Sequence, residues 1–406
     1  MPDRLRVTYF NRSYWPDTGA TGQLLTELAE DLTRDHHIDV TVITGYPVAA
    51  NDGAPLPSRE VRNGVTIVRA SGTTFSPRRF TGRAANYVTY FVSALVAGLR
   101  LPRPDVAVAL TDPPIIGLAA VAARPRCGFV FFCQDIFPEV AGLLEDFHSP
   151  LVNAMLERLN RFLLRRARRV VVLGDTMRDR LVTGKGADPA RMSVIHNWAD
   201  TEAIVPSPKR NVFSDAHGLA DRFVVLHAGN IGMSQNLDVV IDAADHLRSR
   251  DDIVFLFIGD GNRKAALEAA AASRGLDRVR FLPFQPRDQL RWTYATADVC
   301  LVSLKPGLAG YIVPSKLYPI LAAGRPYVAA VEASTEVAAI TARHQCGVLV
   351  EPGDARALAG AVARLADDAA GRLRLGASAR EAAPLFARTR QVAAHAGVLR
   401  TLADAC

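Results

Sequence analysis

The chain has 406 residues, enough for two domains that each bury a core. Apolar residues make up 49% of it and charged residues 22%, the balance of an ordinary globular protein rather than a disordered or fibrous one. The net charge of +7 is spread along the sequence, which argues against a nucleic-acid surface and is compatible with phosphorylated ligands or an anionic membrane face.

The five cysteines form no Cys-x-x-Cys pair, and Cys133 and Cys300 lie in apolar runs. We therefore expect core thiols in a reducing compartment. The charged start predicts no signal peptide, and the longest nearly uncharged run, 84–99, is too short for a confident membrane span. These features predict a cytoplasmic protein, with the inner face of the cell membrane as a further location.

Strands and helices alternate along the first half. The pattern predicts strands at 6–10, 39–44, 66–69, 106–110, 128–133, 170–173 and 193–196, and helices at 23–34, 83–99, 116–123, 150–167 and 175–183. The stretch 200–221 contains Pro206 and Pro208 and has no apolar period, so it is predicted to be a linker and hinge. Helix 83–99 is apolar around most of its surface, which is typical of a buried helix; the alternative is a lipid-facing helix beside Arg78, Arg79 and Arg83.

A second strand–helix series follows. Strands are predicted at 223–228, 253–258, 279–281, 299–303, 327–330 and 347–350, with helices at 236–248, 263–273, 287–296 and 355–366. Such alternation predicts mostly parallel sheets covered on both faces. The expected fold class is therefore α/β, with two Rossmann-like, doubly wound domains facing a central cleft. The boundaries are a first domain at 1–204, a linker at 205–221, a second domain at 222–385 and a C-terminal helix in 386–406 that packs back on the first domain.

Glycine-rich loops occur at corresponding places in the two halves. Gly19 and Gly22 lie between the first strand and the first helix, and Gly229 opens the matching loop of the second half. Either loop, taken by itself, could be an ordinary connection. The alternative is ligand binding, because glycine lets the backbone approach an anionic ligand closely. The spacing is not Gly-x-Gly-x-x-Gly, and the second strand ends in Thr44 rather than an acidic residue, so a nicotinamide oxidoreductase is disfavoured.

Two further motifs follow strands. Pro314-Ser315-Lys316 lies between strands 299–303 and 327–330, where a hydroxyl and an ammonium could hold a phosphate. Asp135 and Glu139 follow strand 128–133; they are either solvated or structural acids, or groups with a catalytic or sugar-binding role. His196 is expected to be a satisfied loop residue. No Asp-x-Asp and no metal-ligand spacing occurs, so the sequence requires no metal.

Several motifs together carry a family resemblance. They are the segments 14–22, 134–139, 196–200, 229–232, 259–261, 314–316 and 350–354. The chain resembles glycosyltransferase family 4, which has the two-domain GT-B fold, and especially the bacterial branch that adds N-acetylated amino-deoxysugars of the fucosamine type during O-antigen and capsule assembly. The resemblance implies retention at the anomeric carbon, a nucleoside diphosphate sugar held by the C-terminal domain, with UDP as the expected nucleotide, and an acceptor bound by the N-terminal domain.

The chain also departs from the family. Tyr311 and Pro319 occupy the places of an acidic pair, and Asn230 and Gln235 replace an Arg and a Lys. Lys316 is our candidate for one of the missing positive charges. Arg12 is a candidate for the other, with an exposed and solvated Arg12 as the alternative.

These considerations predict two sets of site residues. The predicted catalytic residues are Asp135, Lys316 and Glu139. The predicted nucleotide-sugar-binding residues are Gly19, Gly22, Gly229, Asn230, Gln235, Gly259, Asp260, Gly261, Pro314, Ser315 and Lys316. No resident cofactor is expected, because the nucleotide sugar is a co-substrate.

Four functions remain open from the sequence. The leading hypothesis is transfer of a hexosyl or N-acetylhexosaminyl group to a lipid-linked or cell-envelope glycan, with peripheral membrane contact and no nucleic-acid partner. The alternatives are transfer to a small natural product such as an aminoglycoside-type antibiotic, an NDP-sugar 2-epimerase of the same fold, and an inactive sugar-nucleotide-binding module.

Overall fold

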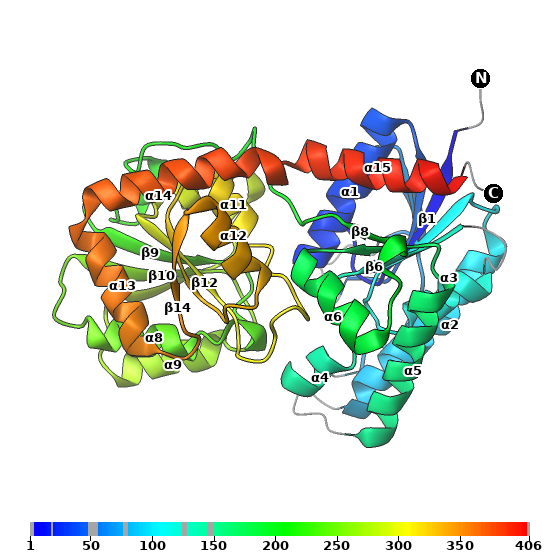
Figure 1. The fold of residues 1–406 in the computed structure, drawn as a ribbon, viewed down its shortest axis with the longest axis horizontal. Helices are drawn as coiled ribbons and strands as arrows, with labels where there is room; N and C mark the ends of the chain where they lie inside the picture. The colour runs from blue at the N-terminus through cyan, green and yellow to red at the C-terminus, as the bar shows by residue number, and fades with distance from the viewer. Residues whose placement is uncertain are drawn as a thin grey trace. The chain divides into compact units, whose positions relative to one another are not determined.

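The computed structural model describes residues 4–17, 19–47, 56–75, 80–123, 128–144 and 149–403. Arg78, Arg79, Cys127 and Cys406 lie outside the described residues. The chain divides into two compact units: unit 1 comprises 1–196 and 391–406, and unit 2 comprises 197–390. Each is described by itself, and Figure 1 shows the elements of both.

Unit 1 contains a sheet in the order β3-β4-β2-β1-β5-β6-β7-β8. Its strands are β1 (Arg6–Phe10), β2 (Asp39–Thr44), β3 (Arg59–Arg62), β4 (Val65–Arg69), β5 (Val106–Ala109), β6 (Gly128–Cys133), β7 (Arg169–Val172) and β8 (Met192–Val194). Its helices are α1 (Ala20–His36), α2 (Phe80–Arg100), α3 (Ile116–Ala123), α4 (Glu139–Leu144), α5 (Pro150–Arg166), α6 (Asp175–Lys185) and most of α15 (Arg388–Ala403). Central strands such as β5 and β6 are buried along their whole length, as expected for a sheet covered on both faces.

Unit 2 contains a parallel sheet in the order β11-β10-β9-β12-β13-β14. Its strands are β9 (Phe223–Ala228), β10 (Ile253–Ile258), β11 (Val279–Leu282), β12 (Val299–Ser303), β13 (Tyr327–Ala330) and β14 (Gly347–Val350). Its helices are α7 (Val212–Ala216), α8 (Asp238–His246), α9 (Lys264–Ser273), α10 (Leu290–Thr296), α11 (Leu317–Ala322), α12 (Glu336–His344), α13 (Ala355–Asp367) and α14 (Ala369–Ala382). Cys133 and Cys300 are buried free thiols, as predicted.

The two sheets confirm the α/β prediction of two Rossmann-like units. Strand order reverses between β1 and β5 in unit 1 and between β9 and β12 in unit 2. In doubly wound sheets ligands bind at the carboxyl ends of the strands beside such a reversal. The topology therefore directs attention to the loops that follow these four strands.

Two local elements were not predicted. The antiparallel strand β3 was missed, although Asn63 and Gly64 have the positive φ angles of a tight hairpin turn, 49° and 82°. The expected linker contains α7, because Asn211 and Ser214 form a reciprocal capping box and Phe213 is buried beneath it.

Candidate active site

The loops after β9 and β10 of unit 2 interlock at positions that only glycine fills. Gly229, Gly259 and Gly261 have φ angles of 127°, 143° and 155°. A Cβ on Gly259 would lie 1.9 Å from the Gly229 carbonyl oxygen, and one on Gly261 would lie 2.3 Å from the Ile231 carbonyl oxygen. The Ile231 amide donates to the Asp260 carbonyl at 2.8 Å. These glycines therefore bring two backbone loops into direct contact at the carboxyl edge of the sheet.

Lys316 reaches the first of these loops from the turn before α11. Its Cε would be 3.8 Å from a Cβ on Gly229, and its Nζ lies 3.4 Å from Nε2 of His227, the fifth residue of β9. Pro314 and Ser315 precede it in the same turn and are partly buried. The structure thus brings the Pro-Ser-Lys turn and the glycine loops of unit 2 together.

Burial sets the charge state of this pair. Desolvation lowers the pKa of Lys316 to about 7. Burial and the neighbouring positive charge hold the pKa of His227 well below its usual value, so its imidazole is neutral. His227 was not among the predicted site residues, because its place near the end of an apolar strand gives no sign that it faces Lys316.

Asn230, Gln235 and Asp260 have local roles in the same loops. Gln235 accepts from the Gly232 amide at 3.0 Å, and Asp260 accepts from the Gly261 amide at 2.8 Å. Asn230 is exposed, and its carbonyl lies 3.3 Å from Nε2 of His227. Gln235 therefore closes its own loop by a side-chain hydrogen bond to the backbone.

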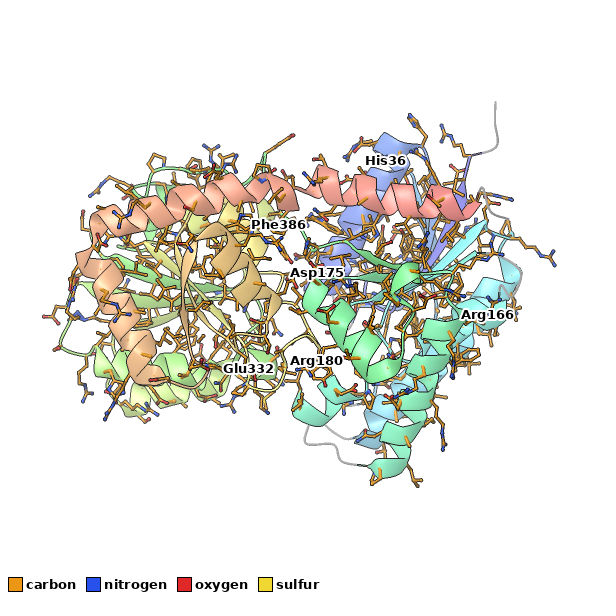
Figure 2. All side chains as sticks on the ribbon, viewed as in Figure 1. His36, Arg166, Asp175, Arg180, Glu332 and Phe386 are labelled. Carbon is orange, nitrogen blue, oxygen red and sulfur yellow. The ribbon has the colours of Figure 1, made fainter. Side chains whose placement is uncertain are left out.

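The loops after β12 and β13 complete this edge of unit 2. The Lys305 amide donates to the Ser234 carbonyl at 2.7 Å, which ties the loop after β12 to the loop after β9. Glu332, labelled in Figure 2, follows β13 and accepts from the Gly307 amide at 2.9 Å. The edge is therefore a continuous set of hydrogen-bonded loops.

Unit 1 has a second polar group at its own strand reversal. Arg12 follows β1 and Asp112 follows β5, and their side chains pair with Nε 3.3 Å from Oδ1. Ser13 Oγ donates to the other oxygen of Asp112 at 2.5 Å, and the Arg12 amide donates to the Asp112 carbonyl at 2.7 Å. Arg12 also lies over the Tyr87 ring, 5.3 Å from its centroid. Arg12 is thus held by partners rather than freely solvated.

Asp135 follows β6, the strand next to β5. Burial, and to a lesser degree the charge of Asp112, raises the pKa of Asp135 to about 7. The charge of Asp112, at the end of one strand, thus acts on Asp135, at the end of the neighbouring strand. Asp112 was not among the predicted site residues, although it follows a buried strand just as Asp135 does.

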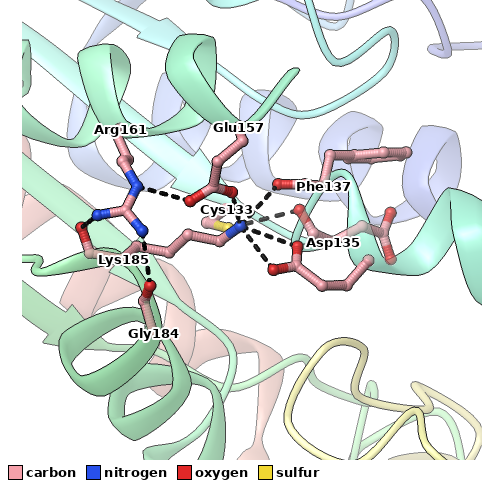
Figure 3. Close-up of polar contacts among 8 residues, drawn as sticks. Cys133, Asp135, Phe137, Glu157, Arg161, Gly184 and Lys185 are labelled. Atoms are coloured by element: carbon pink, nitrogen blue, oxygen red, sulfur yellow. Dashed lines mark hydrogen bonds and ion pairs between the residues drawn. The ribbon is translucent and has the colours of Figure 1, made fainter. Parts of the chain in front are cut away.

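Figure 3 shows the polar contacts around Lys185. Glu139 belongs to this ion-pair cluster through its bond to Lys185. Lys185 Nζ lies 2.7 and 2.9 Å from the two Glu139 oxygens, bonds to Glu157, and donates to the Phe137 carbonyl at 3.3 Å. Arg161 donates to Glu157 at 2.6 Å and to the Gly184 carbonyl at 3.0 Å. The cluster fixes the loop 134–139 to α5 and α6.

Charge within the cluster is compensated. Burial alone would raise the pKa of Glu157, but hydrogen bonds from Lys185 and Arg161 lower it. The side chain of Lys185 is only 3% exposed. Lys185 is therefore a buried cation shared between two carboxylates, and Glu139 has a structural partner in the loop that carries Asp135.

Gly19 and Gly22 lie in unit 1, at the start of α1. Gly19 caps the helix and accepts from the Gln23 amide at 3.0 Å. A Cβ on Gly22 would lie 3.1 Å from the Cβ of Asp17, so this glycine allows the preceding loop to pack on the helix. His196 Nδ1 lies 3.0 Å from the Leu173 carbonyl, which confirms the prediction of a satisfied loop residue.

Comparison with known proteins agrees with this architecture. The family model described as "Glycosyl transferases group 1" matches residues 222–368, and that described as "Glycosyl transferase 4-like domain" matches 19–198. WbjE of Pseudomonas aeruginosa, named as a probable glycosyltransferase, is 29% identical over 326 residues, 79% of each chain. WcaI of Escherichia coli K12, whose name places it in colanic acid biosynthesis, is 40% identical over 136 residues, 33% of each chain.

Two other matches cover more of the chain. The 2-deoxystreptamine glucosyltransferase of Streptomyces kanamyceticus is 27% identical over 352 residues, 80% of this chain and 84% of that one. The solved sucrose-phosphate synthase of Thermosynechococcus elongatus superposes with a TM-score of 0.80 at 19% identity, covering 99% of this chain and 100% of that one. The chain belongs to the glycosyltransferases with the GT-B fold, and the comparisons support a nucleotide sugar as its donor.

Proposed function

We propose that the protein is a retaining glycosyltransferase that moves a sugar from a UDP-linked donor to an acceptor hydroxyl on a lipid-linked or cell-envelope glycan. The observation that carries the proposal is the position of Lys316. Its ammonium group lies beside the glycine loops of unit 2, at the strand reversal where doubly wound folds bind ligands. A desolvated cation at that place suits a diphosphate leaving group.

In the proposed reaction the bond between the anomeric carbon and the diphosphate oxygen breaks as the acceptor oxygen bonds to the same carbon. The acceptor proton passes to the leaving phosphate oxygen, so no separate strong base is required. Lys316 stabilises the charge that grows on the diphosphate, and Ser315 donates a hydrogen bond to it. Removing one such contact costs on the order of 10²–10³ in rate.

Asp135 is proposed to act on the acceptor side. Its carboxyl group lies at the end of β6 and has a pKa of about 7. A hydrogen bond from an acceptor hydroxyl, or a positive charge on the sugar carbon, would lower this pKa and favour the ionised carboxylate. We assign Glu139 a positioning role: its bond to Lys185 holds the loop that presents Asp135. Gly19, Gly22, Asn230 and Asp260 are proposed to contact the nucleotide sugar.

The relatives favour two kinds of acceptor. The name of WcaI supports a cell-envelope glycan, with the N-acetylated amino-deoxysugar branch as the finer hypothesis for the donor. The longer match to a 2-deoxystreptamine glucosyltransferase supports a soluble aminocyclitol as the second candidate. The products of the two reactions can be separated: a lipid-linked product partitions into organic solvent, whereas a glycosylated aminocyclitol stays in water.

A product assay separates these functions. The protein is incubated with a panel of UDP-sugars and either a polyprenyl-diphosphate-linked sugar or 2-deoxystreptamine, and the products are examined by mass spectrometry and proton NMR. The proposal expects a new glycoside with the donor's anomeric configuration on the lipid-linked acceptor. Conversion of donor without acceptor would indicate an epimerase, and donor binding without any product would indicate an inactive binding module.

A further inference from the structure

Helix α2 turns an apolar face outward. Val88, Val92, Val96 and Leu99 are 53%, 51%, 37% and 56% exposed, and their spacing of four, four and three residues places them on one side of the helix. No charged residue occurs between Arg83 and Arg100. The outer side of a surface helix in a globular domain is normally polar.

The other side of α2 is already used for packing. Tyr90 and Ala94 are 2% and 0% exposed, and a Cβ on Gly98 would lie 2.9 Å from Ala123 of α3 and 3.1 Å from the ring of Phe10. The helix is therefore anchored through its inner side. The exposed valines make no contribution to that anchoring. Of the two interpretations of this helix, a buried helix is wrong for its outer side, which is exposed.

Helix α5, on the far side of α3 from α2, also has an exposed apolar side. Leu151, Met155 and Phe162 are 83%, 54% and 41% exposed, and Arg158 and Arg165 are exposed on the same side. The side chain of Leu163 lies over Gly117, so α3 lies next to α5 as well as to α2. All three helices follow crossovers in the same direction along the sheet, which places them on one face, as Figure 1 shows.

The charged residues of α2, α3 and α5 are almost all positive. In α2, α3 and α5 the one acidic residue is Glu157, which is held by Lys185 and Arg161. The same helices carry Arg83, Arg100, Arg158, Arg161, Arg165 and Arg166, the last labelled in Figure 2. A second copy of the chain would place like charges opposite one another, whereas anionic headgroups would neutralise them.

We propose that the outer side of α2 and α5 docks on a lipid bilayer that contains anionic headgroups. Valine, leucine, methionine and phenylalanine side chains would enter the acyl boundary, and the arginines would lie at headgroup level. Within the described ranges no helix is long and apolar enough to span a membrane, so the contact lies in the interface plane.

The test is sedimentation of the full chain with vesicles of phosphatidylcholine and phosphatidylglycerol, and with vesicles of phosphatidylcholine alone. Binding is expected with the anionic vesicles and is expected to weaken at high salt. Val92→Glu and, separately, the double change Arg158→Glu with Arg165→Glu should each weaken binding roughly tenfold. Leu373→Glu, at a residue of α14 that is 76% exposed, is the matched control and should bind like the unchanged protein.

Three results would overturn the proposal. They are absence of binding to anionic vesicles, equal binding to neutral ones, and a concentration-dependent dimer that Val92→Glu dissociates. Circular dichroism of each variant checks that it folds, and the charge-reversal pair leaves the apolar side chains in place. The proposal goes beyond the glycosyl transfer described above, and the assay contains no sugar nucleotide, so its failure is distinguishable from failure of the proposed function.

Discussion

Nζ of Lys316 lies 3.4 Å from Nε2 of His227, at the edge of unit 2 where β9 and β12 meet. His227 is fully buried, and its Nδ1 has no hydrogen-bond partner in the described part of the chain. The imidazole is therefore neutral, and among the described residues no carboxylate pairs with the Lys316 ammonium. An anion that binds here would supply a compensating charge.

Donor affinity should depend on pH through Lys316. Its pKa is about 7 in the folded protein, so the free side chain loses its charge above that pH. A bound diphosphate favours the charged form, so binding takes up a proton and affinity falls as pH rises from about 7 to about 9. Calorimetry of UDP in buffers of different ionisation enthalpy measures this proton uptake.

Lys316→Arg provides the control for that experiment. Guanidinium stays charged throughout this range, so the pH dependence of UDP affinity should flatten. An unchanged slope in the arginine variant would mean that another group titrates.

Gly259→Ala should disrupt the donor loops. Its Cβ would lie 1.9 Å from the Gly229 carbonyl oxygen, so the two loops must separate. Gly275→Ala is the matched control, because Gly275 also has a positive φ, 63°, but a Cβ there meets nothing within 4 Å. The control should cost about 1 kcal/mol in the free energy of unfolding, because alanine is strained in the left-handed region, and Gly259→Ala should cost more and abolish UDP binding. Urea denaturation and calorimetry measure both effects, and equal behaviour of the two variants would count against the loop geometry.

Asp135→Asn should change the pH dependence of stability. The folded-state pKa of Asp135 is raised from 3.8 to about 7, so the folded state binds a proton more tightly than the unfolded state between these values. The contribution of this group to stability is therefore present at pH 4 and is lost as pH rises through about 7. Asparagine is never ionised, so it avoids the cost of burying a charged carboxylate above about pH 7. The variant should therefore be more stable than the native chain at pH 8 but not at pH 4. The urea midpoints of the variant and the native chain are compared at pH 4 and pH 8. The same difference between the two proteins at both pH values would refute the raised pKa of Asp135.

Lys185→Met should destabilise unit 1 and displace Asp135. The change leaves Glu139 and Glu157 facing each other without their shared cation, at a cost of about 3 kcal/mol. Combining it with Glu139→Gln should recover part of that loss, because one uncompensated charge is removed. Thermal unfolding of the two single variants and the double variant measures the coupling. If the changes in the free energy of unfolding simply add, Lys185 and Glu139 do not interact and the proposed role of the cluster is wrong.

The fold could be predicted from the sequence because buried parallel strands are continuous apolar runs. Strands such as 253–258 and 327–330 coincide with the observed β10 and β13. β3 could not be predicted in the same way, since Arg59-Glu60-Val61-Arg62 is a charged edge strand with little apolar signal. The short α7 is set by its capping residues rather than by periodicity.

The candidate site was predicted in part. Glycine and Pro-Ser-Lys motifs located the loops of unit 2, because glycine at a positive φ leaves a sequence signature. The partners of charged groups come from distant segments: Lys316 faces His227, 89 residues away, and Arg12 faces Asp112, 100 residues away. No local pattern encodes those pairs, so the desolvation of Lys316 and the coupling of Asp135 to Asp112 needed the structure.

The central claim is that Lys316 carries the charge of the leaving diphosphate. The most direct measurement is the transfer rate of Lys316→Ala with a donor that the unchanged protein uses, alongside its thermal unfolding. We predict a turnover lower by on the order of 10²–10³ with an unfolding midpoint close to that of the unchanged protein. A variant that folds equally well and transfers sugar at a near-native rate would contradict the account.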